Sequence, residues 1–459
     1  MTPNGDAYFR KHREEHLHQL SAFLRIPSIS ALAAHREDVR RAAQWLVDEL
    51  RRIGMPRVEL FETGGHPLVY AEWLEAEGAP TALIYGHYDV QPVDPLDLWE
   101  TPPFEPSIRD GKIYARGASD DKGQIFMHIK VLEALFQTEG RLPVNVKVLL
   151  EGEEEIGSAN LERFIRDHRD LLKADVVVIS DTSLYAPGVP SITYALRGLA
   201  AMEVEVIGAK GDLHSGLYGG VAPNAIHALA ELLASLRSPD GKIAVEGFYD
   251  DVRPLTEEER QTFASLGFDE EALRQSLGVD ALPGEPGYTA LERMWARPTL
   301  EINSIYGGFQ GEGTKTVIPA RAGAKITCRL VPDQDPERVL DAIERHLKNR
   351  CPAGVKVRVK REEGNSRACI TPVDHPAIRA ALAALEEAYG TEAKFIRSGG
   401  SIPVVEIFSR VLGLPSVLMG FALDSENFHA PNEHFHLENF DRGLRTLYAY
   451  WHKLAEALS

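Results

Sequence analysis

The segment TALIYGHYDVQP ends an apolar run with two residues that could bind or support a cation. Side chains alternate along a strand, so His87 and Asp89 would project from the same face. Open α/β sheets place ligands at the carboxyl ends of their strands, where this pair falls. A carboxylate beside a metal-binding histidine holds its tautomer and raises its basicity. Taken alone, the pair is more typical of a turn histidine with a capping aspartate.

Carboxylates gather at two further predicted element boundaries. In YARGASDDKG, Asp120 and Asp121 begin a predicted helix, and two adjacent aspartates exceed what capping requires. In VKVLLEGEEEIGS, an apolar strand runs directly into four glutamates: Glu151, Glu153, Glu154 and Glu155. Carboxylates clustered at a strand end repel one another, so the cluster favours a cation that neutralises them, with a solvated acidic loop as the alternative.

Two more segments add ligand types to this set. The strand VVVISD ends in Asp181, and FALDSENFHAPNE presents His429 in a polar loop after the apolar segment LPSVLMG. All of these residues fall at predicted strand ends of one sheet. Histidine and carboxylate ligands without thiolates suit zinc, manganese or cobalt in a catalytic site that retains a water.

The elements that position these residues predict an α/β protein of two domains. Between residues 58 and 180, apolar strands alternate with helical stretches, which indicates a mainly parallel sheet covered by helices. From residue 198 the order becomes βαββαβ, which suits a ferredoxin-like α+β domain. A polar, Pro-rich and weakly helical stretch from 237 to 298 is predicted to be an insertion within it. After residue 367 the α/β pattern returns, so we expect domains at 1–197 with 365–459 and at 198–364.

Composition excludes several classes of protein. The chain has 459 residues and a formal net charge of −18, which argues against binding nucleic acid or an anionic membrane. Three cysteines without a CxxC pair suggest neither a disulfide framework nor a thiolate zinc site, and a reducing cytoplasm fits best. No apolar run is long enough to span a bilayer.

The motifs together resemble the M20 family of metallopeptidases, closest to its carnosinase-like dipeptidase branch. The resemblance covers nearly the whole chain and rests on the order of nine motifs. These are HYDVQP, RGASDDKG, EGEEEIGS, VISD, GDLHSGLYGG, GTKTVIP, RLVP, GGSIPV and FHAPNE. It implies a catalytic domain that binds two divalent ions per subunit, zinc first among them, and a lid and dimerisation domain.

The resemblance also implies a role for each candidate residue. His87 and Asp181 would bind one metal, and Glu155 and His429 the other. Asp120 would bridge both metals. Glu154 would be the general base and Asp89 the partner of His87. The tandem glutamates leave a question of register, which aligning EGEEEIGS on the pattern E-G-x-E-E-x-G resolves in favour of Glu154 as the base.

Substrate contacts are expected from the second domain and from the loop near residue 400. The resemblance implies His214 in GDLHSGLYGG as an oxyanion donor and Arg329 in RLVP as a clamp for a substrate carboxylate. Gly399, Gly400 and Ser401 precede a predicted helix and could add backbone and hydroxyl donors. An ordinary strand salt bridge is the alternative for Arg329.

The predicted function is metal-dependent hydrolysis of the amide bond of a dipeptide or similarly small substrate with a free C-terminal carboxylate. An N-acyl amino acid deacylase of the same family is the alternative, since only the substrate pocket differs. A binding or scaffold protein that lost catalysis is disfavoured, because Glu154 and all the ligands are present. We further expect a homodimer in which His214 completes the partner's active site.

Overall fold

The computed structural model describes residues 3–362 and 364–459, and the chain divides into two compact units. The first unit comprises Met1–Tyr194, Thr371–Ile396 and Ile407–Ser459. The second comprises Ala195–Ile370 and Arg397–Glu406. Compared with the predicted boundaries, this division also assigns residues 195–197, 365–370 and 397–406 to the second unit.

The first unit is built on a sheet with strand order β1-β2-β6-β3-β7-β18-β9. The strands are β1 (Arg57–Phe61), β2 (Leu68–Trp73), β3 (Thr81–His87), β6 (Asn145–Glu151), β7 (Val176–Ile179), β9 (Ser191–Leu196) and β18 (Ser416–Leu418). The four central strands, β6, β3, β7 and β18, run parallel, whereas the flanking pairs are antiparallel. Every residue of β7 is buried, as are all but the first residue of β3 and β6, which explains their unbroken apolar sequences. The predicted α/β class with a mainly parallel sheet is confirmed.

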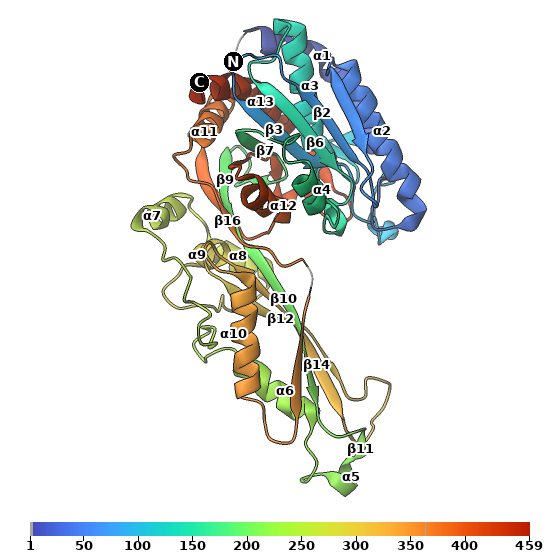
Figure 1. Ribbon diagram of the computed structural model, residues 1–459, viewed down its shortest axis with the longest axis vertical. Helices are drawn as coiled ribbons and strands as arrows, with labels where there is room; N and C mark the ends of the chain where they lie inside the picture. Colours follow the sequence, from blue (N-terminus) through green and yellow to red (C-terminus); the bar gives the residue numbers. More distant parts are fainter. Residues whose placement is uncertain (1–2, 363) are drawn as a thin grey trace. The chain divides into compact units, whose positions relative to one another are not determined.

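Helices pack against this sheet and against one another (Figure 1). They are α1 (Pro3–Leu24), α2 (Arg36–Arg52), α3 (Lys122–Glu139), α4 (Leu161–Asp167), α11 (Pro376–Tyr389) and α13 (Leu437–Ala457). Helix α12 (Pro403–Ile407) begins in the second unit and runs into a π-helical turn at Phe408–Leu412 in the first. Fourteen consecutive residues of α3, from Lys122 to Leu135, are buried. Because α3 is buried in this way, it fixes the turn directly before it, which carries Asp120.

Short strands complete the first unit. The pair β4 (Ser107–Arg109) and β5 (Lys112–Tyr114) joins β20 (His434–His436), and β8 (Ser183–Leu184) pairs with β19 (Ala422–Leu423). The pairing of β5 with β20 brings a segment near residue 113 beside one near residue 435. The loops that carry Asp120 and His429 are thereby brought together.

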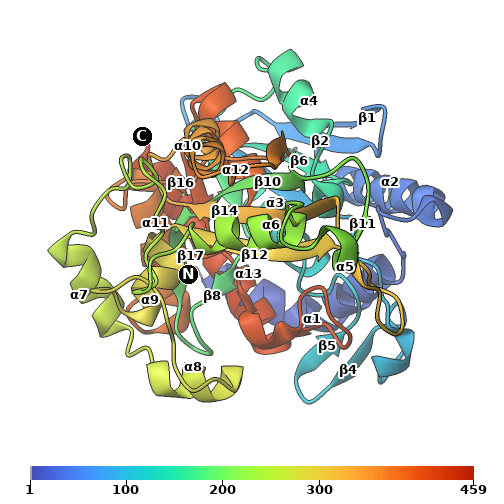
Figure 2. The ribbon, with the colours of Figure 1, turned by 90° about the horizontal axis from the view of Figure 1, so that it is seen from below.

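The second unit has the βαββαβ order that the sequence predicts. Its elements are β10 (Gly198–Ile207), α6 (Ala225–Ala234), β12 (Thr299–Gly307), β14 (Arg321–Leu330), α10 (Pro336–Asn349) and β15 (Lys356–Arg361). The sheet is antiparallel with order β12-β14-β10-β15, and Figure 2 shows β10, β14 and β12 side by side with α6 in front. Alternate residues of β10 are buried, because the helices cover one face of the sheet.

Three short helices occupy the stretch between α6 and β12: α7 (Glu257–Ser265), α8 (Glu270–Leu277) and α9 (Ala290–Ala296). Capping boxes begin α7 at Thr256 and α9 at Thr289, and a small apolar cluster around Phe263 and Leu291 holds these two helices together. Smaller elements of the second unit are β11 (Leu213–His214), α5 (Ser215–Tyr218), β13 (Val317–Ile318) and β16 (Cys369–Ile370), and β17 (Lys394–Ser398) crosses the unit boundary. In the described part of the chain, no helix combines the length and apolar character needed to cross a membrane.

Candidate active site

The parallel strands of the first unit bring the predicted site residues to one edge of the sheet. His87 is the last residue of β3, and β3 lies between β6 and β7 in parallel register. Glu151 ends β6, with Glu154 three residues beyond it, and Asp181 follows β7 by two residues. Because parallel strands end at the same edge, these polar groups converge there.

Two clusters of metal-binding side chains form at this edge. His87, Asp120 and Asp181 make one cluster, and Asp120, Glu155 and His429 make the other. In the first, His87 Nε2 lies 3.1 Å from Asp120 Oδ1 and 3.7 Å from Asp181 Oδ2. In the second, His429 Nε2 lies 2.9 Å from Asp120 Oδ2 and 3.3 Å from Glu155 Oε2. Asp120 therefore presents one carboxylate oxygen to each cluster.

These separations fit a pair of divalent ions. Tetrahedral ligands at bond lengths of about 2.1 Å stand about 3.4 Å apart, close to the distances between the histidine nitrogens and the carboxylate oxygens. The donor set of imidazoles and carboxylates without thiolates is typical of a catalytic site for zinc, manganese or cobalt. His87, Asp120 and Asp181 would hold one ion, and Asp120, Glu155 and His429 the other.

Asp89 contacts both His87 and the glutamate loop. Both side chains of the pair are fully buried, and His87 Nδ1 lies 3.4 Å from Asp89 Oδ1 and 3.1 Å from the Asp89 backbone oxygen. The Asp89 carboxylate also accepts hydrogen bonds from the backbone nitrogens of Glu154 and Glu155, at 3.2 and 3.1 Å. One carboxylate thus orients a histidine ligand and anchors the turn that carries the predicted base and a ligand, a second role that the sequence does not reveal.

Glu154 begins a short 3₁₀ turn, and its side chain lies outside both ligand clusters. Burial raises the pKa of its carboxyl well above the usual range, and the nearby charges of Asp181, Glu155 and Asp120 raise it further. Glu155 instead points toward His429, and Gln91 Nε2 donates to its Oε2 at 2.8 Å. The two adjacent glutamates therefore occupy different positions: one within a ligand cluster and one beside it.

Hydrogen bonds with neighbouring carboxylates stabilise the charged forms of both histidines. Although burial opposes the shift, Asp120 and Asp89 raise the pKa of His87 well above its usual value. Hydrogen bonds to Asp120 and Glu155 raise the pKa of His429 to about 10. A metal ion would take the place of these protons, since histidine ligates as the neutral imidazole.

Glu433 supports Asp120 and was missed by the sequence analysis. Its buried carboxylate accepts hydrogen bonds from Arg116 Nη1 at 2.7 Å, Gly117 N at 3.0 Å, Ser119 N at 3.0 Å and Asp120 N at 3.1 Å. The turn that aims Asp120 is thus built around this carboxylate. The available sequence signal was its position at the end of FHAPNE, four residues after His429.

The predicted substrate contacts lie in the second unit, where three of the four are close together. Arg329 Nη1 donates to Ser401 Oγ at 2.9 Å, and the backbone nitrogen of neighbouring Gly400 donates to Ser398 Oγ at 3.1 Å. His214 is exposed, and its Nδ1 accepts a hydrogen bond from Gly216 N at 3.0 Å. Arg329 is paired with Leu199 near the start of β10, whereas His214 follows the far end of that strand.

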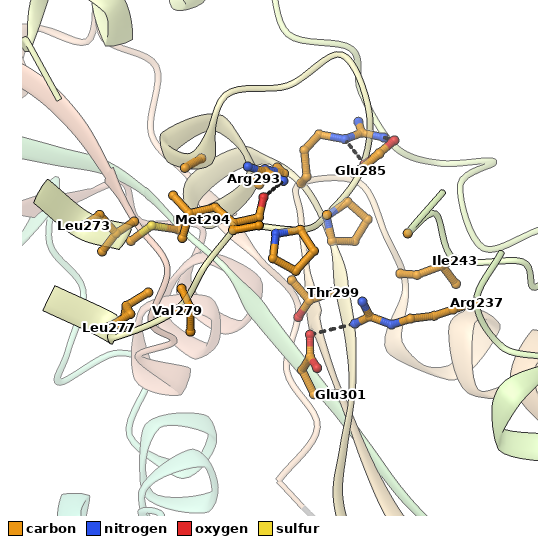
Figure 3. A pocket seen from close by; sticks show the side chains of 18 of the residues that line it. Arg237, Ile243, Leu273, Leu277, Val279, Glu285, Arg293, Met294, Thr299 and Glu301 are labelled. Atoms are coloured by element: carbon orange, nitrogen blue, oxygen red, sulfur yellow. Dashed lines mark hydrogen bonds and ion pairs between the residues drawn. The ribbon is translucent and has the colours of Figure 1, made fainter. Parts of the chain in front are cut away.

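A cavity of about 360 Å³ in the second unit lies beside the short helices of the insertion (Figure 3). Its wall is largely apolar, and two ion pairs neutralise much of its charge: Arg297 with Glu285 and Arg237 with Glu301. None of the predicted site residues lines it. The candidate chemistry therefore lies at the sheet edge of the first unit, and we assign no reaction to this cavity.

The fold and the paired clusters define a class of enzyme that comparison with known proteins identifies. Residues 83–453 match the model of peptidase family M20/M25/M40. The chain belongs to this peptidase family. The predicted M20 membership and the predicted class, a hydrolase that acts on peptide bonds, are confirmed.

Relatives with full-length similarity place the chain within the family. The Cys-Gly metallodipeptidase dug1 of Schizosaccharomyces pombe is 33% identical, with 97% of this chain and 96% of the relative aligned. The human Beta-Ala-His dipeptidase is 33% identical over 98% of this chain and 92% of its own length. A solved M20 metallo-carboxypeptidase from Sulfolobus solfataricus is 35% identical with a TM-score of 0.84, over 96% of this chain and 99% of that one. The predicted carnosinase-like branch is confirmed.

Proposed function

We propose that the protein is a metallodipeptidase that hydrolyses the amide bond of dipeptides with a free C-terminal carboxylate, using two divalent ions, preferably zinc. The observation that carries the proposal is the sharing of Asp120, whose two carboxylate oxygens face separate histidine and carboxylate clusters. Two such clusters joined by one carboxylate could hold the pair of ions that a dinuclear hydrolytic site uses. The names of the full-length relatives, two of which are dipeptidases, support the substrate class.

The side chains of the first unit have distinct tasks in this reaction. Divalent ions held by His87, Asp120 and Asp181 and by Asp120, Glu155 and His429 would lower the pKa of a water and polarise the scissile carbonyl. Glu154, which lies beside the ligand clusters, would accept a proton from the attacking water and later return it to the leaving amine. Asp89 would keep His87 in the tautomer that leaves Nε2 free to bind a metal, because its oxygens lie close to Nδ1 and can accept the proton there.

The carboxylate of the substrate is proposed to bind at Arg329 and Ser401. A guanidinium binds a carboxylate through two parallel hydrogen bonds, and the serine hydroxyl supplies a third donor. Gly400 would contribute its backbone nitrogen after exchanging its bond to Ser398. Such a clamp would restrict cleavage to the last peptide bond of the substrate, since the charged terminus must lie one residue from the scissile bond.

The deacylase alternative is less well supported, because the most similar relatives include two named for dipeptide substrates. The Sulfolobus metallo-carboxypeptidase favours a second candidate, removal of a C-terminal residue from longer peptides. Both peptidase activities need the carboxylate clamp, so Arg329 does not distinguish them. The length of the accepted peptide does.

We propose a homodimer in which His214 reaches the partner's active site. Along β10, the eight residue steps from Leu199 to Ile207 span about 27 Å, which separates His214 from the carboxylate clamp of its own subunit. Exposed apolar side chains include Leu217 and Val221 close to His214 in sequence, Ile305 on the outer strand β12, and Phe309 two residues after that strand. An outer strand with exposed apolar neighbours suits pairing with a second copy. The three free cysteines support a cytoplasmic location.

The test of the function is hydrolysis by metal-free protein after addition of Zn, Mn or Co. Dipeptides, tripeptides and N-acetyl amino acids with the same C-terminal residue form the substrate panel. We expect chelated protein to be inactive and each effective metal to restore dipeptide hydrolysis above the other two classes. Full activity in protein shown by elemental analysis to be free of metal would refute the mechanism. Preference for tripeptides would establish the carboxypeptidase reading, and preference for N-acetyl substrates the deacylase reading.

A further inference from the structure

Arg197 connects strand β9 to β10 and contacts every residue of the loop Gly399–Ser401. Its Nε donates to the Gly399 carbonyl at 2.8 Å, and its backbone nitrogen donates to the Gly400 carbonyl at 3.0 Å. Ser401 Oγ donates to the Arg197 carbonyl at 2.5 Å. Three consecutive loop residues are therefore fixed by one arginine.

Ser401 links Arg197 to the proposed carboxylate clamp. The hydroxyl that donates to the Arg197 carbonyl also accepts from Arg329 Nη1 at 2.9 Å. This pattern fixes the hydroxyl proton toward Arg197 and leaves the oxygen turned toward the second guanidinium. Without the contacts of Arg197 to the loop Gly399–Ser401, the Ser401 side chain would be free to rotate away from Arg329.

Two guanidinium groups, Arg197 and Arg329, share this region, and Ser401 contacts both residues. Neither Arg197 nor Arg329 forms an ion pair within residues 3–362 and 364–459. Arg197 Nη1 is buried and has no hydrogen-bond partner in the same ranges. Burial and the charge of Arg329 lower the pKa of Arg197 to about 10, so both groups stay charged at neutral pH. Like charges held together in this way provide a positive potential for an anion.

The close approach depends on the absence of a side chain at residue 399. A Cβ on Gly399 would lie 2.9 Å from Arg197 Nη2 and 2.9 Å from the Met294 carbonyl oxygen. The loop can therefore lie against the guanidinium only because this residue is glycine.

We infer that Arg197 is a positioning residue for substrate binding, which holds the loop Gly399–Ser401 against Arg329 and adds its charge to the binding of the substrate's C-terminal carboxylate. The inference rests on the proposed function, because it assumes that a carboxylate occupies the clamp. Arg197 acts through its neighbours, and Arg329 and Ser401 make the direct contacts.

The test compares Arg197→Met and Arg197→Lys with wild type, all loaded with metal. The substrates are a dipeptide with a free carboxylate and the same dipeptide as its C-terminal amide. We expect Arg197→Met to raise KM for the free acid by roughly ten- to a hundredfold, with kcat and the amide reaction changed much less. Arg197→Lys should recover part of the loss, since it restores the charge and one donor. The control is Arg293→Met, which removes another half-buried arginine that donates to a backbone carbonyl of the same unit, at Leu282, and should leave KM unchanged.

Binding measured without turnover separates this inference from the proposed function. A dipeptide analogue with a reduced peptide bond, as free acid and as amide, is titrated calorimetrically into each protein. Weaker binding of only the free acid to Arg197→Met supports the inference, whether or not the wild type cleaves dipeptides. Equal losses for acid and amide, or unchanged binding of both, overturn it. Failure of the wild type to cleave any dipeptide would instead refute the proposed function.

Discussion

Replacing Glu433 with alanine should destabilise the first unit and weaken metal binding together. The change leaves the buried Arg116 guanidinium, whose side chain is 1% exposed, without its carboxylate, and deprives three backbone N–H groups of their acceptor. Breaking a buried ion pair by removing one partner costs about 3–5 kcal/mol. We expect a loss of that size in the free energy of unfolding, measured by urea titration. The freed turn no longer aims Asp120, so elemental analysis should find less than a full complement of metal.

Two further variants make the interpretation specific. Glu438→Ala removes an exposed glutamate that pairs with Arg442 one helical turn away, and it should change the free energy of unfolding by no more than about 0.5 kcal/mol. The double variant Glu433→Leu/Arg116→Met removes both buried charges and should recover much of the lost stability, but not the metal, because the backbone donors remain unsatisfied. A loss below about 1 kcal/mol in Glu433→Ala, with both metals retained, would refute the argument.

Three further predictions concern the base, a buried histidine and the dimer. Glu154→Gln should lower kcat by about 10²–10⁴-fold while both metals stay bound, and loss of metal would instead make Glu154 a ligand. Burial lowers the pKa of His128 to about 3 in the folded protein. In the unfolded chain this histidine has its ordinary pKa of 6.5, so between these two pH values only the unfolded chain binds the proton. The free energy of unfolding should therefore decrease as the pH is lowered from 6.5 to about 3. His128→Gln should reduce the slope of the free energy of unfolding against pH by up to about 1.4 kcal/mol per pH unit, and equal slopes in variant and wild type would contradict the assignment. Glu154→Gln and His214→Ala proteins, each inactive, should regain about a quarter of wild-type activity when refolded together, and no recovery despite subunit mixing would place His214 in its own subunit's site.

The fold was predictable where sequence patterns reflect burial. The strands β3, β6 and β7 are apolar throughout because both sheet faces are covered, and polar residues appear only where each strand ends. The ferredoxin-like order followed from a change of pattern near residue 198. Boundaries were less well defined, since residues 397–406 belong to the second unit although the chain on both sides of them belongs to the first.

The candidate site was predictable where a residue's type announces its chemistry. Histidines and carboxylates at strand ends indicated metal ligands, and the two clusters around Asp120 contain all five proposed ones. Supporting residues gave no such signal. Glu433 and Arg197 act through hydrogen bonds to backbone groups more than 200 residues away in sequence, and only the folded chain brings them to those partners.

The pairing of Asp120 with His429 across 309 residues also determines when the site can form during synthesis. Both segments of the second unit, Ala195–Ile370 and Arg397–Glu406, lie between these two residues in sequence. The ribosome therefore synthesises the second unit before it reaches His429, the histidine of the second cluster. A nascent chain that has passed only residue 181 can contain His87, Asp120 and Asp181, and therefore one cluster without the other. On the proposed ligand assignment, the paired site can therefore form only after the C-terminal segment that carries His429 has emerged and folded.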